Sequence, residues 1–289
     1  MGCRGTGRVR KRFQAQRSHP LTYPRSLGKS GVLRTAESIA MDKRTFHVEL
    51  EGITLRGEVY IPESKPAPAL CLCHGIPRGG PPDTSDPGYP ALAERFCQAG
   101  FLTAIFNFRG AGDSEGNFDI AGWTRDLVAV LDYLYNMSQV DRGKISLMGF
   151  SAGAAVSVYV ASHDSRVSSL IACACPAHFD FATDHESAKS AIAQFRDIGI
   201  IKDQGFPPSV AHWMDGINRV KPIEQIEKVS PRPLLIIHGT QDDVVDLTSA
   251  RALYERAGEP KEIMVIEGAG HRLRVEQQAM DGALNWLTT

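Results

Sequence analysis

The sequence predicts an α/β fold in which a mainly parallel sheet is flanked by helices. Short apolar runs recur between residues 44 and 289, and segments with a helical spacing of apolar residues separate them. The runs have the length and β-branched content of buried strands, and they lie at 67–73, 102–108, 145–150, 167–175, 233–238 and 262–266. Strands that alternate with helices form βαβ units, whose strands run parallel.

The first two predicted strands differ from the others. Residues 45–50 and 53–61 alternate apolar and polar side chains, with Glu51-Gly52 between them, which is typical of an antiparallel hairpin. Helical patterns follow at 90–99, 124–137, 152–162, 247–257 and 272–287.

One stretch interrupts the alternation. Residues 177–229 contain no strand pattern, and only 188–195 and 222–228 look helical. Such a long connection in a compact domain is usually functional or has its own structure. We expect it to form a short cap over one edge of the sheet.

Composition is that of an ordinary soluble globular protein, since 43% of the 289 residues are hydrophobic and 22% are charged. No apolar run reaches the roughly 18 residues of a membrane-spanning helix. Residues 1–40 hold nine basic side chains against one acidic one, so the overall charge of −1 leaves −9 for residues 41–289. An acidic body argues against a nucleic-acid or anionic-membrane partner.

The basic segment 1–40 shows neither a helical nor a strand period. We expect a disordered or non-native extension, and an organelle transit peptide is the alternative. The folded domain is then expected to occupy residues 41–289.

The cysteines predict no metal site. Two pairs lie two residues apart within apolar runs, where a strand puts both thiols on one face; the full set is Cys3, Cys71, Cys73, Cys97, Cys173 and Cys175. We expect buried, reduced side chains, because zinc sites favour Cys-x₂-Cys spacing with a second ligand pair. Reduced thiols without an apolar leader indicate the cytoplasm.

The strongest chemical motif is Gly149-Phe150-Ser151-Ala152-Gly153, which follows an apolar strand and begins a helix. In this context Gly-x-Ser-x-Gly forms a sharp turn that exposes the serine hydroxyl, and glycines avoid crowding of the backbone. Ser151 is the predicted nucleophile. The amide of Ala152 then lies at a helix N-terminus, where it can stabilise an oxyanion.

A serine nucleophile needs a base and an orienting acid, which should follow it in the order acid, then histidine. His271 follows the strand predicted at 262–266, and we expect it to be the base. Asp242 follows the strand predicted at 233–238 and is the expected acid, with Asp243 as the second choice. An aspartate that is not used, Asp246 included, would cap the next helix.

The second oxyanion donor should come from Cys73-His74-Gly75-Ile76-Pro77. Gly75 permits a close approach to substrate, and the amide of Ile76 is the expected donor because Pro77 has none. His74 is expected to brace this loop rather than to contact substrate.

Together these motifs resemble the α/β-hydrolase superfamily over residues 44–289, and most of all its serine aminopeptidase-like and prolyl-oligopeptidase-like group. The matching pieces are His74-Gly75-Ile76-Pro77, Asn107–Gly116, the serine turn, His238-Gly239-Thr240-Gln241-Asp242 and Gly270-His271. The resemblance implies Ser151 as nucleophile, Asp242 as acid, His271 as base, and Ile76 and Ala152 as oxyanion donors. The Asn107–Gly116 loop lacks dinucleotide-binding glycine spacing. We expect it to shape the rim, with Arg109 and Asp113 as a candidate ion pair.

The predicted activity is hydrolysis of a small acyl ester through an acyl-enzyme, with neither cofactor nor metal. An aminopeptidase, amidase or thioesterase would use the same machinery. An aminopeptidase should hold a cap carboxylate for the substrate amine, for which Asp180, Asp184, Glu186 and Asp215 are available. The alternative from another class is a non-catalytic, hydrolase-like binding protein.

Overall fold

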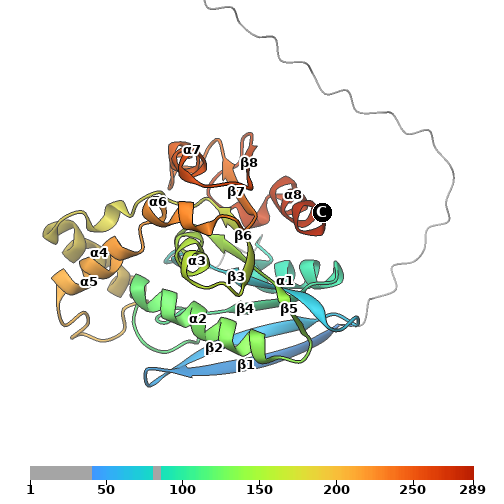
Figure 1. Ribbon diagram of the computed structural model, residues 1–289. Helices are drawn as coiled ribbons and strands as arrows, with labels where there is room; N and C mark the ends of the chain where they lie inside the picture. The colour runs from blue at the N-terminus through green and yellow to red at the C-terminus, as the bar shows by residue number, and fades with distance from the viewer. Residues whose placement is uncertain (1–40, 81–85) are drawn as a thin grey trace, which may run out of the picture. The chain divides into compact units, whose positions relative to one another are not determined.

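A computed structural model describes residues 41–80 and 86–289, so the expectation for 1–40 lies outside the described residues. Its centre is an eight-stranded sheet with the order β1-β2-β4-β3-β5-β6-β7-β8 (Figure 1). The pairs β1–β2 and β2–β4 are antiparallel, and all later pairs are parallel. The predicted fold class is confirmed.

The strands begin and end close to the apolar runs that predicted them. Their bounds are β1 Asp42–Leu50, β2 Ile53–Ile61, β3 Ala67–Cys73, β4 Leu102–Phe106, β5 Val140–Phe150, β6 Val167–Cys173, β7 Leu234–Gly239 and β8 Lys261–Ile266.

The helices fill the connections between them. They are α1 Gly88–Gln98, α2 Ile120–Asn136, α3 Ala152–His163, α4 His185–Asp197, α5 Val210–Arg219, α6 Pro222–Gln225, α7 Leu247–Arg256 and α8 Gln277–Thr288. Short 3₁₀ turns are η1 Asp180–Ala182, η2 Ile226–Val229 and η3 Leu273–Val275.

The turn between β1 and β2 determines how the two strands pair. Glu51 and Gly52 both have positive φ, 53° and 79°. That turn geometry matches the twist of paired strands. The pairing runs without a shift from Leu50 opposite Ile53 to Asp42 opposite Ile61.

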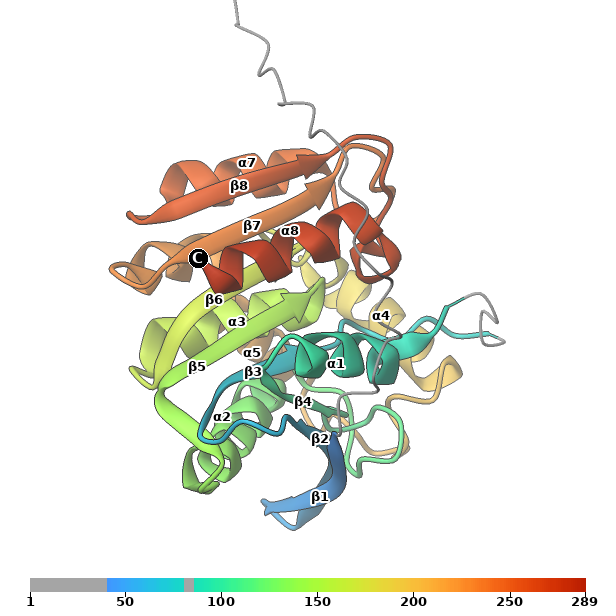
Figure 2. The same cartoon turned by 90° about the vertical axis from the view of Figure 1, so that its right-hand side faces the viewer.

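Both faces of the parallel part of the sheet are buried. On β3, Cys71 and Cys73 face the core under α2 and α3, whereas Leu70 and Leu72 face the core under α1 and α8. Figures 1 and 2 show these two helix pairs on opposite sides of the sheet. The arrowheads of β5, β7 and β8 point the same way in Figure 2, so their carboxyl ends share one edge.

The second cysteine pair does not share a face. Strand β6 ends at Cys173, and Ala174 turns the backbone at a φ of 48°. Cys173 therefore lies in the core under α1 and α8, and Cys175 in the core under α2 and α3. Both thiols are buried, as expected.

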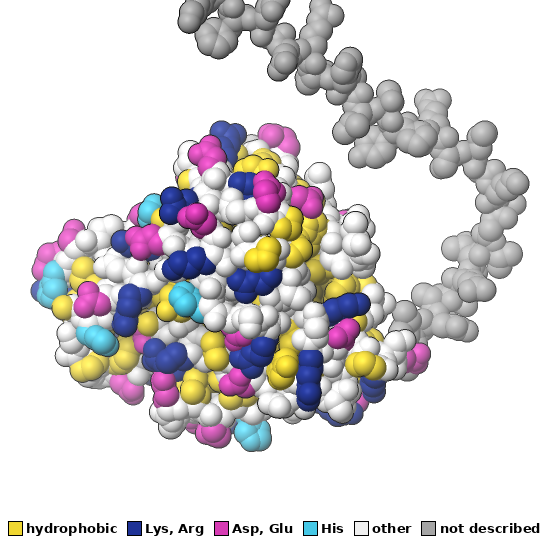
Figure 3. Space-filling view, in the orientation of Figure 1, with side chains coloured by type: hydrophobic (Ala, Val, Ile, Leu, Met, Phe, Trp, Pro, Cys, Tyr) yellow, Lys and Arg dark blue, Asp and Glu magenta, His cyan; other side chains and the backbone are white. Residues whose placement is uncertain are grey.

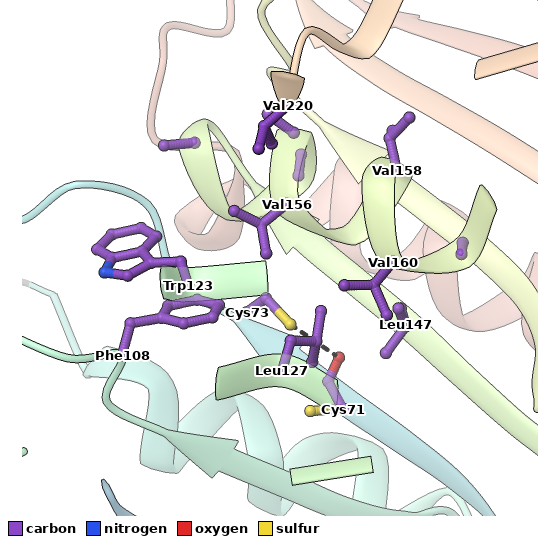
Figure 4. Close-up of a cluster of buried hydrophobic side chains, with 14 of the residues drawn as sticks. Cys71, Cys73, Phe108, Trp123, Leu127, Leu147, Val156, Val158, Val160 and Val220 are labelled. Atoms are coloured by element: carbon purple, nitrogen blue, oxygen red, sulfur yellow. Dashed lines mark hydrogen bonds between the residues drawn. The ribbon is translucent and has the colours of Figure 1, made fainter. Parts of the chain in front are cut away.

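The Asn107–Gly116 loop is anchored in the core. Phe108 stacks on Trp123 with ring centroids 4.4 Å apart (Figure 4). The indole of Trp123 donates to the carbonyl of Arg109 over 3.0 Å, and Ser114 Oγ donates to the carbonyl of Asn107 over 2.6 Å. These contacts hold the loop in place against the core.

The expected partner of Arg109 was wrong. Its guanidinium bonds the fully buried carboxylate of Asp126 over 2.7 and 2.9 Å and also reaches Glu51, whereas Asp113 is exposed. Helix α2 places Asp126 directly beneath the loop, and the sequence spacing between these residues carries no signal of that contact.

The insertion at 177–229 is helical, and sequence reasoning missed its helix α5. The signal was present, because Ser209 caps the helix and apolar side chains recur at 210, 213, 214 and 217. Trp213 packs with Phe118, Phe181 and Phe195, which joins α4 and α5 to the loop that precedes α2.

The carboxyl-terminal helix starts later than predicted. Helix α8 begins at Gln277, and the 3₁₀ turn η3 precedes it. Over the described ranges, no helix is both long and apolar enough to cross a membrane.

Replacing Asp126 by alanine should lower the free energy of unfolding by about 3–5 kcal/mol, because Arg109 would stay buried without its main partner. Urea unfolding followed by tryptophan fluorescence measures the change. The matched control is Asp113→Ala, which should stay within about 0.5 kcal/mol of the wild type. Equal effects of the two changes would contradict the assignment of Asp126.

Candidate active site

Ser151 occupies a strained turn between β5 and α3. Its φ of 54° and ψ of −124° are unusual for a residue with a side chain. Three neighbours need to lack a Cβ: at Gly149 it would lie 2.5 Å from Ala154 Cα, at Gly153 2.3 Å from the His74 oxygen, and at Gly75 2.9 Å from Ser151 Cβ. The turn is also fixed by the amide of Ser151, which donates to the Cys173 carbonyl over 2.9 Å.

Asp242 and His271 lie in direct contact, from the loops after β7 and β8. Nδ1 of His271 is 2.9 and 3.0 Å from the two carboxylate oxygens of Asp242. A carboxylate only accepts, so Nδ1 carries the hydrogen and Nε2 is left as the basic nitrogen.

The carboxylate of Asp242 is fully buried and well bonded. It accepts the amides of Val244 and Val245 over 2.9 and 2.8 Å. Burial alone would raise the pKa of Asp242, but the bonds from His271 and from the two amides outweigh it and hold this pKa below its usual value. The acid is therefore ionised beside the imidazole.

A second histidine, His238, contacts the same carboxylate from inside the sheet. Its fully buried ring donates from Nε2 to the Val245 carbonyl over 2.8 Å and lies 3.4 Å from Asp242 Oδ2. Its Nδ1 is buried without a partner in the described part of the chain. The sequence analysis assigned His238 no role. Its position four residues before Asp242 could have indicated this contact.

The other aspartates of this loop are directed elsewhere. Asp243 is exposed, and Asp246 caps α7 by accepting the amide of Thr248 over 2.8 Å. The capping role foreseen for an unused aspartate thus falls to Asp246.

His74 braces the loop after β3, as its sequence context indicated. Nδ1 donates to the carbonyl of Gly75 over 2.7 Å, and Nε2 accepts the amide of Phe108 over 3.1 Å. This pattern requires a neutral ring. Burial lowers the pKa of His74 to about 4, against a smaller raising effect of the Gly75 carbonyl.

The expected oxyanion donors flank the serine. Ala152 is the first residue of α3, so its amide has no partner within the helix. Ile76 follows Gly75, whose backbone lies against Ser151, and it lines the same cavity as the serine.

One cavity of about 1200 Å³ contains Ser151 and His271. Ser151 Oγ makes no hydrogen bond to any described residue, and catalytic bonds often tighten only when substrate binds. The cavity wall also includes the loop after β3, the loop of η3 and the outer hairpin β1–β2.

The insertion touches this cavity only indirectly. Described residues of 177–229 are not among the lining, but Ile198 packs where a Cβ on Gly79 would lie, 2.5 Å from Ile198 Cγ2. A separate hollow of about 650 Å³ lies on the insertion itself, around Asp215 and Arg219.

The carboxylates considered for a substrate amine are placed elsewhere. Asp184 caps α4 by accepting the amides of Glu186 and Ser187, and Glu186 pairs with Lys189 over 3.0 Å. Asp180 and Asp215 are also absent from the described lining of the Ser151 cavity. Across residues 41–80 and 86–289, no cluster of three or more potential metal ligands is found.

Sequence comparison identifies a protein family whose model matches this chain. The model of the prolyl oligopeptidase family matches residues 89–288. Among curated proteins, Rv2307c of Mycobacterium tuberculosis, itself uncharacterised, is 25% identical over 256 residues, which cover 88% of this chain and 80% of that protein.

Solved structures show the same fold. The Pyrococcus furiosus esterase Pf2001 superposes with a TM-score of 0.64 at 18% identity, covering 92% of this chain and 98% of its own. Est1E from Butyrivibrio proteoclasticus, also solved with ferulic acid, gives 0.60 at 17% identity over 84% and 95%. The chain has the α/β-hydrolase fold.

Acid should destabilise the protein through His74. Its folded pKa of about 4 lies below the usual value of about 6.5, so the stability of the neutral form is complete above pH 6.5 and is lost as the pH falls toward 4. The expected loss is about 1.4 kcal/mol per pH unit. Urea unfolding at about pH 7.5 and about pH 5.5 measures it.

The control for this loss is His74→Gln, which removes the titrating ring. We expect the variant to lose about 1.4 kcal/mol less between the two pH values than the wild type does. An unchanged pH dependence in the variant would show that another group is responsible.

Proposed function

We propose that this chain, which belongs to the prolyl oligopeptidase family, hydrolyses acyl esters with Ser151, His271 and Asp242 as its catalytic triad. The observation that carries the proposal is the pairing of His271 Nδ1 with the buried Asp242, at 2.9 Å, at the rim of the cavity that Ser151 enters. This pairing leaves Nε2 of His271 as the base on the cavity side.

The reaction follows from these positions. Ser151 Oγ attacks the acyl carbon while Nε2 of His271 takes its proton, and Asp242 stabilises the imidazolium that forms. The amides of Ile76 and Ala152 donate to the developing oxyanion. His271 then protonates the leaving alcohol, and a water molecule repeats the cycle to release the acid and free Ser151.

The position of the cap carboxylates favours an ester over a peptide. An aminopeptidase that held the substrate amine with its cap would need a cap carboxylate facing the cavity, whereas Asp184 and Glu186 are occupied within the insertion. Of the carboxylates that do line the cavity, Glu58 and Asp86 are already ion-paired. Structural neighbours that carry the name esterase agree with this choice. Aminopeptidase, amidase and thioesterase activity remain the alternatives that a substrate panel separates: para-nitrophenyl esters, acyl thioesters and aminoacyl anilides.

A non-catalytic binding role is the alternative from another class. A fluorophosphonate probe reacts with an activated serine, so it should label the folded protein at Ser151 and fail on Ser151→Ala. A folded wild type that resists the probe would favour the binding role.

Loss of the nucleophile or base should nearly abolish turnover. We expect Ser151→Ala and His271→Ala each to lower kcat for a para-nitrophenyl ester by about 10⁴–10⁶-fold, because the two residues act as a unit. Circular dichroism controls for folding. Full activity of either variant would rule out this mechanism.

The identity of the acid is tested by a matched pair of neighbours. Asp242→Asn should lower kcat by about 10⁴-fold, because an amide cannot hold His271 in the same tautomer. Asp243→Asn, which changes the same charge one residue away, should stay within about twofold of the wild type. The reverse order would transfer the role to Asp243.

A further inference from the structure

The cavity extends well beyond the catalytic residues. Its volume of about 1200 Å³ exceeds the roughly 300–1,000 Å³ of most small-molecule sites. At its far end it reaches the exposed face of the hairpin, where Thr45 lies opposite Glu58 and His47 opposite Arg56. Side chains at these alternate positions share one face of the strands.

The cavity is rich in arginine although the body of the protein is acidic. Its lining contains Arg56, Arg78, Arg272 and Arg274 against three carboxylates, Glu58, Asp86 and Asp113. Residues 41–289 as a whole carry a formal charge of −9. On the face shown in Figure 3, by contrast, basic and acidic side chains are interspersed without a patch of one sign.

Two of the three carboxylates are already paired. Glu58 lies 3.1 Å from Lys43 Nζ and accepts the hydroxyl of Tyr60 over 2.6 Å. Asp86 binds the guanidinium of Arg274 through both oxygens and lies 3.8 Å from Arg272. Neither acid is free to neutralise the remaining arginines.

Of the arginines that line the cavity, Arg56 and Arg78 have no acidic partner among the described residues. Within the described residues, no carboxylate lies at ion-pair distance from either guanidinium, and both side chains are exposed at the cavity. Arg78 lies two residues after Ile76, the proposed oxyanion donor, and Arg56 lies on β2. The backbone of Arg56 is tied to the loop that follows β4, since its carbonyl accepts the amide of Asn107 over 3.0 Å.

We propose that Arg56 and Arg78 receive an anionic group, a carboxylate or a phosphate, that the ester substrate carries away from its reacting carbonyl. This proposal rests on the proposed function and narrows its substrate class to acidic esters. Guanidinium groups match the geometry of both anions. Because they lie away from the reacting atoms, they should contribute mainly to substrate binding and therefore to KM.

The kinetic test compares two substrates of equal length, para-nitrophenyl hexanoate and the para-nitrophenyl monoester of adipate, whose chain ends in a carboxylate. The wild type should prefer the adipate monoester, and Arg56→Gln and Arg78→Gln should each raise its KM about two- to fivefold, as expected for an exposed pair. Hydrolysis of the hexanoate should change less than twofold. Added salt should weaken the preference.

A matched control is Arg251→Gln, an exposed arginine on α7 outside the cavity, which should leave both substrates unaffected. A phosphate-bearing ester of the same acyl length forms a second arm that separates phosphate from carboxylate recognition. Equal KM values for the neutral and both acidic esters, or a loss in Arg56→Gln that is the same for all of them, would overturn the proposal.

Binding to Ser151→Ala separates this proposal from the proposed function. Calorimetry with methyl hexanoate and the methyl monoester of adipate measures recognition without turnover. Tighter binding of the acidic ester, lost in the added Arg56→Gln and Arg78→Gln changes, supports the anion site even in a protein that turns over no ester. Equal binding of the two esters contradicts the site even when ester hydrolysis is established.

Discussion

The site depends on one close contact, the approach of the backbone at His74 and Gly75 to the turn that carries Ser151. This contact leaves no space for a Cβ at Gly75 or Gly153. It is held by the neutral ring of His74, which links the loop to the amide of Phe108. Phe108 in turn stacks in the core on Trp123, so core packing behind the cavity wall helps to fix the position of the serine.

A comparable close approach of two backbone segments fixes the loop that carries His271. A Cβ on Gly239 would lie 2.2 Å from the carbonyl oxygen of Ala269, so the loop after β7 and the loop before His271 touch through their backbones. The ring of the buried His238 also contacts Asp242, with Nε2 lying 3.4 Å from Oδ2. Asp242 and His271 therefore have fixed relative positions in the absence of any ligand, which is the preorganisation that the proposed reaction would require.

The sequence predicted what is local in the chain. The serine turn, the strands and the aspartate that contacts His271 are encoded by short spacings, and they lie where those spacings predicted. Contacts between distant segments have no such pattern in the sequence. Arg109 pairs with Asp126 on helix α2 and not with Asp113, which is closer to it along the chain. Helix α5 is a different case, because its apolar spacing and its cap at Ser209 are visible in the sequence and would have predicted this helix.

The hairpin β1–β2 forms a wall of the cavity that is built separately from Ser151, Asp242 and His271. Its strands pair in an unbroken register, so every second side chain, including Thr45, His47 and Arg56, faces outward without supporting the core. Substitutions of exposed side chains there should cost little folding energy and leave the contact between His271 and Asp242 unchanged. Directed evolution of ligand selectivity would therefore be most productive at these positions, where a single codon can alter the wall of the cavity without altering the core.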